Sequence, residues 1–264
     1  MTTLQAIILG AIQGVTEFLP VSSSGHLVVM KHLLDITEIP ILFDVLLHLS
    51  TLAVVVIVFR KKVGAILSAL FRGIARRTKD EDRENLRLFL IIVIATAVTA
   101  VIGYAVSFLH VEHKPKIVSL LFIATAGVLV GTRFVKGKKG YGDIGVKEGI
   151  ITGAAQGLGV FPGISRAGIT ISASLYAGLS REKAGEFSFL ISIPAIIGAF
   201  VLTLKDAETL GSMVSPGPLT VGIAVSFFVG LGSLLLLLRL IQKGRLYFAA
   251  FYLVPLGVFS FIFL

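Results

Sequence analysis

The residues of this chain that could do chemistry lie mostly in two short stretches, 10–27 and 153–170. Each stretch is apolar in large part and broken by glycine and proline. The first contributes an acid, a hydroxyl and an imidazole, and the second a fixed positive charge; these residues are Glu17, Ser23 and His26 in the first stretch and Arg166 in the second. Ionisable groups inside apolar segments are costly, so each is a functional hypothesis.

Glu17 follows Gln13 by four residues, which places both side chains on one face of a helix. A carboxylate at this position could hold a divalent cation through its oxygens or act as a general base, with Gln13 as a second oxygen ligand. The alternative is a structural, hydrogen-bonded glutamate.

His26 follows Ser23 by three residues, so a helix would set the hydroxyl beside the imidazole. This pair could be a serine nucleophile with its base, or a histidine nucleophile with a hydroxyl partner. The alternative is a histidine that only satisfies its own hydrogen bonds.

In the second stretch, Pro162 and Gly163 precede a new half-helix with Arg166 in its first turn. Free N–H groups at a helix N-terminus together with a guanidinium form a site for phosphate. We expect Gly163, Ser165 and Thr170 to assist Arg166. The alternative is a salt bridge between Arg166 and Glu17.

Asp44 and His48 share a helix face in a later apolar run. We favour a structural pair at the end of a helix; a supporting position around the site is the alternative.

The two stretches resemble each other at one fixed offset, which indicates an internal repeat with a site at its interface. The matched pairs are Gly10/Gly153, Ala11/Ala154, Gln13/Gln156, Gly14/Gly157, Phe18/Phe161, Ser22/Ser165 and Gly25/Gly168.

The composition predicts an integral membrane protein. Of 264 residues 55% are hydrophobic and only 15% charged, and the mean hydropathy is +0.96; a soluble domain is about a quarter charged. The basic residues flank apolar runs, which indicates membrane topology and not nucleic-acid binding. The chain has no cysteine, which excludes disulfides and thiolate chemistry.

We predict an all-α polytopic protein with six transmembrane helices and two re-entrant helical hairpins. The six runs are 41–59, 88–109, 117–132, 185–204, 215–238 and 246–264. The half-helices of the hairpins are 3–19 with 21–34 and 149–161 with 163–179, joined at Pro20 and Pro162. Two ordinary kinked spans are the alternative.

The basic residues support the re-entrant interpretation. Most of the 24 Lys and Arg residues fall in segments 60–87, 133–148, 180–184 and 239–245, and few in 35–40, 110–116 and 205–215. With re-entrant hairpins the first group is cytoplasmic. The chain is then one membrane domain with an inverted-topology repeat, about 1–135 and about 149–264.

At these residues the sequence resembles the bacterial undecaprenyl-pyrophosphate phosphatase family associated with bacitracin resistance. Its (E/Q)xxxE motif reads Gln13 to Glu17, followed by a Leu-Pro-Val-Ser-Ser-x-Gly-His block at 19–26. Its PGxSRSxxT motif reads Pro162 to Thr170. Two departures are Gln13, where many members have Glu, and Ala167, which replaces the second serine of that motif.

The resemblance implies hydrolysis of a C55 polyprenyl diphosphate to the monophosphate, with Mg²⁺ or Ca²⁺, in the bacterial plasma membrane with the site opening outward. This reaction recycles the carrier lipid of cell-wall synthesis. A homodimer is compatible with these observations. The alternative from another class is a lipid-phosphate transporter or flippase, because inverted repeats with broken helices are typical of transporters. Transport does not require the Glu17, Ser23 and His26 group.

Overall fold

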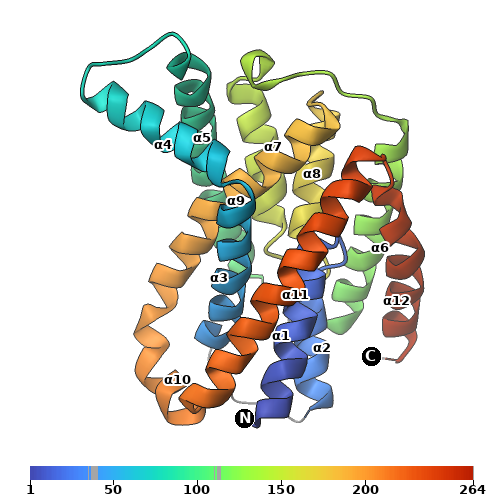
Figure 1. Cartoon of the computed structure of the whole chain (residues 1–264). Coiled ribbons are helices and arrows are strands. Elements are labelled where there is room, and N and C mark those ends of the chain that lie inside the picture. The colour runs from blue at the N-terminus through green and yellow to red at the C-terminus, as the bar shows by residue number, and fades with distance from the viewer. Residues whose placement is uncertain (35, 37–40, 110, 112–113, 264) are drawn as a thin grey trace.

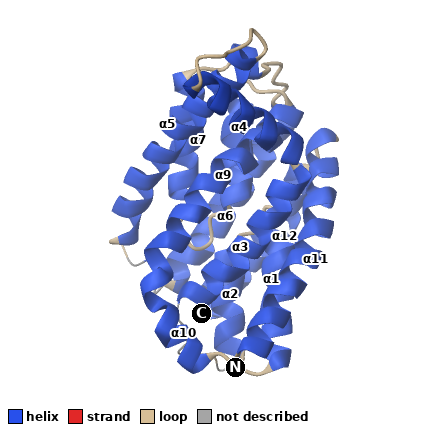
Figure 2. Cartoon of the chain, turned by 60° about the vertical axis from the view of Figure 1, so that its left-hand side comes forward, coloured by secondary structure: helices blue, strands red, loops and turns tan. Residues whose placement is uncertain are grey.

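The computed structural model describes residues 1–34, 36, 41–109, 111 and 114–263, and these form helices joined by short loops (Figures 1 and 2). In this part of the chain the only β pairing is an isolated bridge between Lys139 and Leu179. Six helices are long and apolar enough to cross a membrane, which confirms the six predicted runs. Three of these spans are α3 (Ile41–Val58), α5 (Asp82–Ser107) and α11 (Pro216–Gln242). The other three are formed by α6 (Pro115–Gly131), α9 (Arg181–Thr203) and α12 (Ala250–Phe263), each continued by adjacent short helices to give spans of 116–134, 181–211 and 246–263.

The two polar stretches fold as pairs of half-length helices, α1 (Thr3–Phe18) with α2 (Ser23–Leu33) and α7 (Val146–Leu158) with α8 (Arg166–Tyr176). The helices break at the predicted prolines. The pairs enter the bundle from opposite ends, and their connecting loops meet near its middle (Figure 1). At this meeting point the Gly163 N–H donates to Ser22 Oγ at 3.0 Å.

Glycines permit the closest helix contacts. A Cβ at Gly10 of α1 would lie 2.4 Å from the Gly222 carbonyl oxygen of α11, and a Cβ at Gly153 of α7 would lie 2.4 Å from the Ala95 carbonyl oxygen of α5. Small residues let helix backbones approach this closely in membranes. Gly10 and Gly153, which match in the repeat, therefore have the same packing role. Gly10 of the first hairpin packs against α11, the second span after the second hairpin, and Gly153 of the second hairpin packs against α5, the second span after the first hairpin.

Two further helices lie outside the predicted elements. α4 (Arg60–Ile74) falls in the segment predicted as a basic cytoplasmic connection, and α10 (Ala207–Met213) lies in the connection after α9. α4 forms because apolar residues recur at helical spacing among the basic ones. α5 begins at Asp82, six residues before the predicted run, where that buried carboxylate accepts hydrogen bonds from Arg72.

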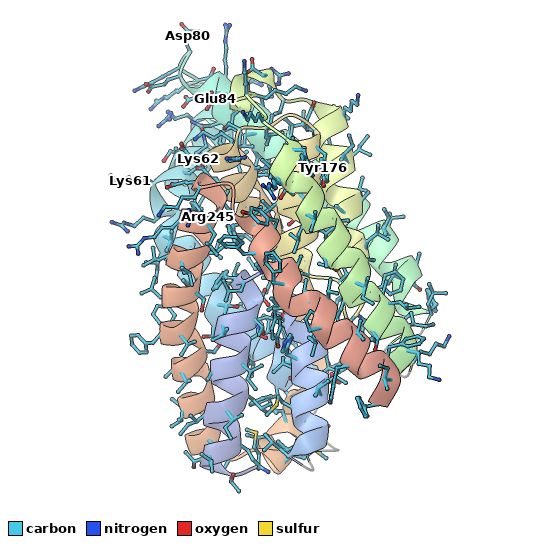
Figure 3. All side chains as sticks on the ribbon, turned by 90° about the vertical axis from the view of Figure 1, so that its right-hand side faces the viewer. Lys61, Lys62, Asp80, Glu84, Tyr176 and Arg245 are labelled. Carbon is cyan, nitrogen blue, oxygen red and sulfur yellow. The ribbon has the colours of Figure 1, made fainter. Side chains whose placement is uncertain are left out.

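The predicted connection at 35–40 lies outside the described residues except for Ile36, and residues 110, 112 and 113 of the connection at 110–116 and the last residue of the run 246–264 also lie outside them. The remaining connections divide by charge. Figure 3 shows Lys61, Lys62 and Arg245, together with Asp80 and Glu84, at one end of the molecule. The basic segments of the sequence thus gather at that end, which is also the end where the second hairpin enters.

Candidate active site

The meeting of the two loops joins the acid of one stretch to the cation of the other. Arg166 Nη2, in the first turn of α8, forms an ion pair with Glu17 Oε1 near the end of α1, although 149 residues separate them. The Glu17 side chain is 4% exposed, and that of Arg166 25%. The salt bridge proposed as an alternative role for Arg166 therefore exists, while part of the guanidinium stays open.

The second carboxylate oxygen of Glu17, Oε2, accepts hydrogen bonds from two other polar side chains of the first hairpin. Ser23 Oγ donates to Glu17 Oε2 at 2.8 Å, and Gln13 Nε2 donates to the same oxygen at 3.0 Å. A serine whose hydroxyl proton points at a carboxylate is arranged for proton loss. Glu17 and Ser23 thus form an acid–hydroxyl pair, with Gln13 fixing the carboxylate.

His48 of α3 lies at the site, which matches the alternative, not the favoured, interpretation of this residue from the sequence. Its Nδ1 lies 2.9 Å from Glu17 Oε2 and 2.8 Å from Gln13 Nε2. The favoured interpretation, a structural pair of Asp44 with His48, does not describe the structure, because Asp44 Oδ2 pairs with Lys31 Nζ at 2.6 Å. The available signal was the cost of an imidazole inside a membrane span.

His26 is directed away from this group. Its Nδ1 lies 2.8 Å from the Ser22 carbonyl oxygen, to which it can only donate, so Nε2 accepts from Tyr252 Oη at 2.7 Å. The ring stacks on that of Tyr252, with centroids 5.7 Å apart. The structure therefore does not form the predicted Ser23–His26 pair: the spacing is helical, but the imidazole is held by α12 and the loop carbonyl.

The residues of the second hairpin that are predicted to bind phosphate make most of their contacts within the protein. Gly163 has φ +93°, where an L side chain is strained. Ser165 caps α8 by accepting from the Gly168 N–H at 3.1 Å. Thr170 donates to the Arg166 carbonyl oxygen at 2.8 Å and contacts the Ser188 hydroxyl. These contacts fix the start of α8. Arg166 is paired with Glu17 but partly exposed, so its guanidinium is the group of this set that can also reach a ligand.

A cavity of about 850 Å³ opens beside the ion pair. The polar part of its lining includes Glu17, Ser23, His48, Ser165 and Arg166. Its walls come from the second halves of α5 and α9 and are mostly apolar; they include Val101, Tyr104, Pro194, Ala199 and Leu202. The cavity is charged at one end and apolar along its length, which suits an amphiphile with an anionic head.

Few ligands near Glu17 are available to a divalent cation. Gln13 Oε1 is buried beside the Glu17 carboxylate and has no hydrogen-bond partner among the described residues. The part of the chain that the structure describes contains no cluster of three or more His, Cys, Asp or Glu that could enclose a metal ion. One carboxylate and one amide oxygen could hold Mg²⁺ or Ca²⁺ only if the substrate's phosphates and water supplied the other ligands.

Comparison with known proteins identifies the family. The profile of the family described as Bacitracin resistance protein BacA matches residues 6–259. The undecaprenyl-diphosphatase of Treponema denticola is 49% identical over 98% of this chain and 96% of its own length. Those of Desulfosudis oleivorans and Borrelia recurrentis are 42% and 37% identical, over 97% and 95% of this chain and the same shares of their own lengths.

Both sequence motifs lie within the matched region, which runs from the first turn of α1 to the last part of α12. This chain belongs to the bacitracin resistance protein BacA family.

Proposed function

We propose that this multi-pass membrane protein hydrolyses undecaprenyl diphosphate to the monophosphate and inorganic phosphate. The observation that carries the proposal is the cavity, whose charged end and apolar walls match a diphosphate head and a polyprenyl tail. The relatives are undecaprenyl-diphosphatases, which indicates the substrate. The apolar walls fit a substrate that carries a hydrocarbon chain and do not fit a soluble diphosphate.

Arg166 binds the diphosphate in this proposal. A guanidinium offers two parallel N–H donors to phosphate oxygens, and the adjacent N-terminus of α8 adds a favourable dipole. In the structure Arg166 is paired with Glu17. Substrate binding would transfer the guanidinium from the carboxylate to the phosphate, which leaves Glu17 with more basic character at the moment of reaction.

Ser23 is the proposed nucleophile. Its Oγ attacks the terminal phosphorus while its proton passes to Glu17 Oε2, its hydrogen-bond acceptor at 2.8 Å. The bond from that phosphorus to the bridging oxygen breaks, and the lipid monophosphate leaves. Glu17 passes this proton to the departing lipid phosphate and is a carboxylate again. It then takes a proton from a water molecule that attacks the phosphorus bonded to Ser23. The bond from phosphorus to Ser23 Oγ breaks, Ser23 Oγ regains a proton from Glu17, and inorganic phosphate leaves. The contacts of His26 support a role in holding the Ser22 carbonyl and α12.

A divalent cation, Mg²⁺ or Ca²⁺, would be held by Glu17 with Gln13 Oε1 and by the phosphates of the substrate. When bound it neutralises negative charge on the transferring phosphoryl group. If Glu17 binds it, Glu17→Gln abolishes turnover and also removes the rise of thermal stability on adding Mg²⁺. Persistence of that rise in the variant would leave Glu17 with the role of base alone.

We also propose that both hairpins are re-entrant and that the cavity opens outward from the bacterial plasma membrane. The cavity is lined by the halves of α5 and α9 that lie away from the basic segments. By the positive-inside rule those basic segments are cytoplasmic. The two repeats, about 1–135 and about 149–264, would then have opposite orientations in the membrane.

Phosphate release from undecaprenyl diphosphate by the purified protein in detergent tests the function directly. Detergent removes any membrane gradient, so a transporter would release no phosphate there. We expect multiple turnovers, with none in the matched Ser23→Ala protein purified in the same way. Binding of the lipid without phosphate release would contradict the proposed hydrolysis and favour transport.

A further inference from the structure

α4 presents an apolar face that no described residue covers. Leu67, Phe71 and Ile74 are 47%, 68% and 73% exposed, and they recur at the spacing of a single helix face. Gly64 lies on the same face, and a Cβ there would meet no described atom within 4 Å. The opposite face holds the helix to the protein, because Ile66 and Ala69 are buried.

Basic residues border this face without acidic partners. Arg60 and Lys61 precede it, and Arg76 and Arg77 follow it. None of these four forms an ion pair with another described residue, whereas Lys62 is paired with Glu84 and Arg72 with Asp82. The four cations therefore lie at the two ends of the apolar face, and the paired ones lie toward the protein.

The position of α4 determines what can cover the face. The chain leaves the membrane span α3 at Val58 and enters α4 at Arg60, and α4 then runs sideways beyond the bundle at its basic end (Figures 1 and 3). A helix that leaves a span at this point lies at the level of lipid headgroups. An amphipathic helix with apolar residues on one side and cations beside them binds in that layer, where it is attracted to anionic lipids.

We infer that α4 is a binding surface for anionic phospholipids at the cytoplasmic interface. Its apolar face of Gly64, Leu67, Phe71 and Ile74 inserts below the headgroups, and Arg60, Lys61, Arg76 and Arg77 contact their phosphates. The inference does not depend on the hydrolytic function, because none of these residues lines the cavity beside Arg166. A second copy of the chain is the competing occupant.

The absence of tryptophan from the chain permits a sharp test. Phe71→Trp places a single fluorescent reporter on the apolar face. Gly142→Trp is the matched control, since it lies at the same end and a Cβ there meets no described atom within 4 Å. Each variant is reconstituted into vesicles of phosphatidylcholine and phosphatidylglycerol, in which one lipid at a time carries bromine on its acyl chains. Cooperative thermal unfolding in detergent reports whether each protein is folded.

We expect brominated lipid to quench the Phe71→Trp reporter by about twofold or more, because an interfacial helix buries its apolar face roughly 5–10 Å deep. The Gly142→Trp control should not be quenched. At equal mole fractions, brominated phosphatidylglycerol should quench the Phe71→Trp reporter more than brominated phosphatidylcholine. Replacing Arg60, Lys61, Arg76 and Arg77 by Gln should remove that difference while the protein stays folded.

Three results would overturn the inference. A solvent-like emission of the Phe71→Trp protein with no quenching would mean that the face lies in water. Equal quenching by both lipids in the same protein would remove the anionic preference. Unquenched but blue-shifted emission that reverts to solvent-like on dilution of the protein in lipid would assign the face to a second copy. Leu67→Trp repeats the measurement if Phe71→Trp does not fold.

Discussion

The two hairpins share a scaffold and differ in chemistry. The matched glycines Gly10 and Gly153 both allow a helix to lie against a neighbouring backbone. By contrast, the positions that match Glu17 and Ser23 in the second hairpin are Val160 and Arg166. The repeat therefore preserves packing where its copies agree at these glycines, and the groups that we propose to react lie where the copies have diverged.

Matched residues can also take different roles. Both glutamines are buried. Gln13 contacts Glu17 and His48, whereas Gln156 donates to Thr99 Oγ1 and to the Ile191 carbonyl oxygen, both at 3.2 Å. The Gln13 amide thus contacts the Glu17 carboxylate, while the Gln156 amide, which lines the cavity, links α5 and α9. Identity between the repeats is thus a guide to structure and not, by itself, to the site.

The largest effect we expect is from Ser23→Ala, at the position where the first hairpin carries its proposed nucleophile. Turnover should fall by about a thousandfold or more, as for removal of a nucleophile that acts as part of a unit. Initial rates of phosphate release measure this. Ser68→Ala, at an exposed position of α4 that does not line the cavity, is the control and should stay near wild type. A Ser23→Ala protein with substantial turnover would return the nucleophile's role to His26.

Arg166→Lys tests the reactive residue of the second hairpin. Charge is kept, but an ammonium cannot grip two phosphate oxygens as a planar guanidinium does. A loss on the order of a hundredfold is expected, typical of removing one transition-state donor. Arg239→Lys, at an exposed position of α11, should be neutral. Near wild-type turnover in a folded Arg166→Lys protein would rule out the phosphate-binding role.

Glutamate in place of each matched glutamine should separate their roles. Gln156→Glu leaves the Ile191 carbonyl oxygen without its donor in a fully buried place, at a cost of about 1–3 kcal/mol in the free energy of unfolding. Gln13→Glu removes the donor to Glu17 Oε2 and places a second carboxylate beside the first in an equally buried place, so without a cation it should cost at least as much. Added Mg²⁺ should restore stability to Gln13→Glu and not to Gln156→Glu, and thermal unfolding in detergent compares them. An equal response of both variants to Mg²⁺ would contradict the division of roles.

The shared scaffold predicts equal effects at the matched glycines. Gly10→Ala and Gly153→Ala each place a methyl group against a backbone carbonyl and should each destabilise by about 1–3 kcal/mol. Gly232→Ala in α11 is the control, because its Cβ would meet no described atom within 4 Å, and should stabilise by about 0.5–1 kcal/mol. Thermal unfolding detects both signs. A strong effect at only one matched glycine would break the equivalence.

Much of the fold could be predicted because it depends on local signals. Long apolar runs indicated the six spans, and prolines with small residues indicated the two breaks. α4 was missed because its periodic apolar residues lie within a segment dominated by basic residues. The contact between Glu17 and Arg166 could be expected from the repeat, because both residues lie beside the loops of the two helical hairpins and these loops meet.

The rest of the site depends on partners distant in sequence. His48 reaches Glu17 from α3, and nothing within the motif at 13–17 indicates that contact. His26 has the helical spacing for a contact with Ser23, but Tyr252, 226 residues away, holds its ring instead. Short-range spacing thus identified the reactive residue types, while tertiary packing decided which of them meet.

The most direct test of the account is the side from which each hairpin enters the membrane. The chain has no native cysteine, so single cysteines at Ile36, Gly140, Glu182 and Gly211 can be labelled with an impermeant thiol reagent in intact cells. Positions 36 and 211 should react at once, and 140 and 182, on either side of the second hairpin, only after permeabilisation. Labelling of 182 while 140 stays protected would show that the segment crosses the membrane, and would contradict a site built by two opposed hairpins.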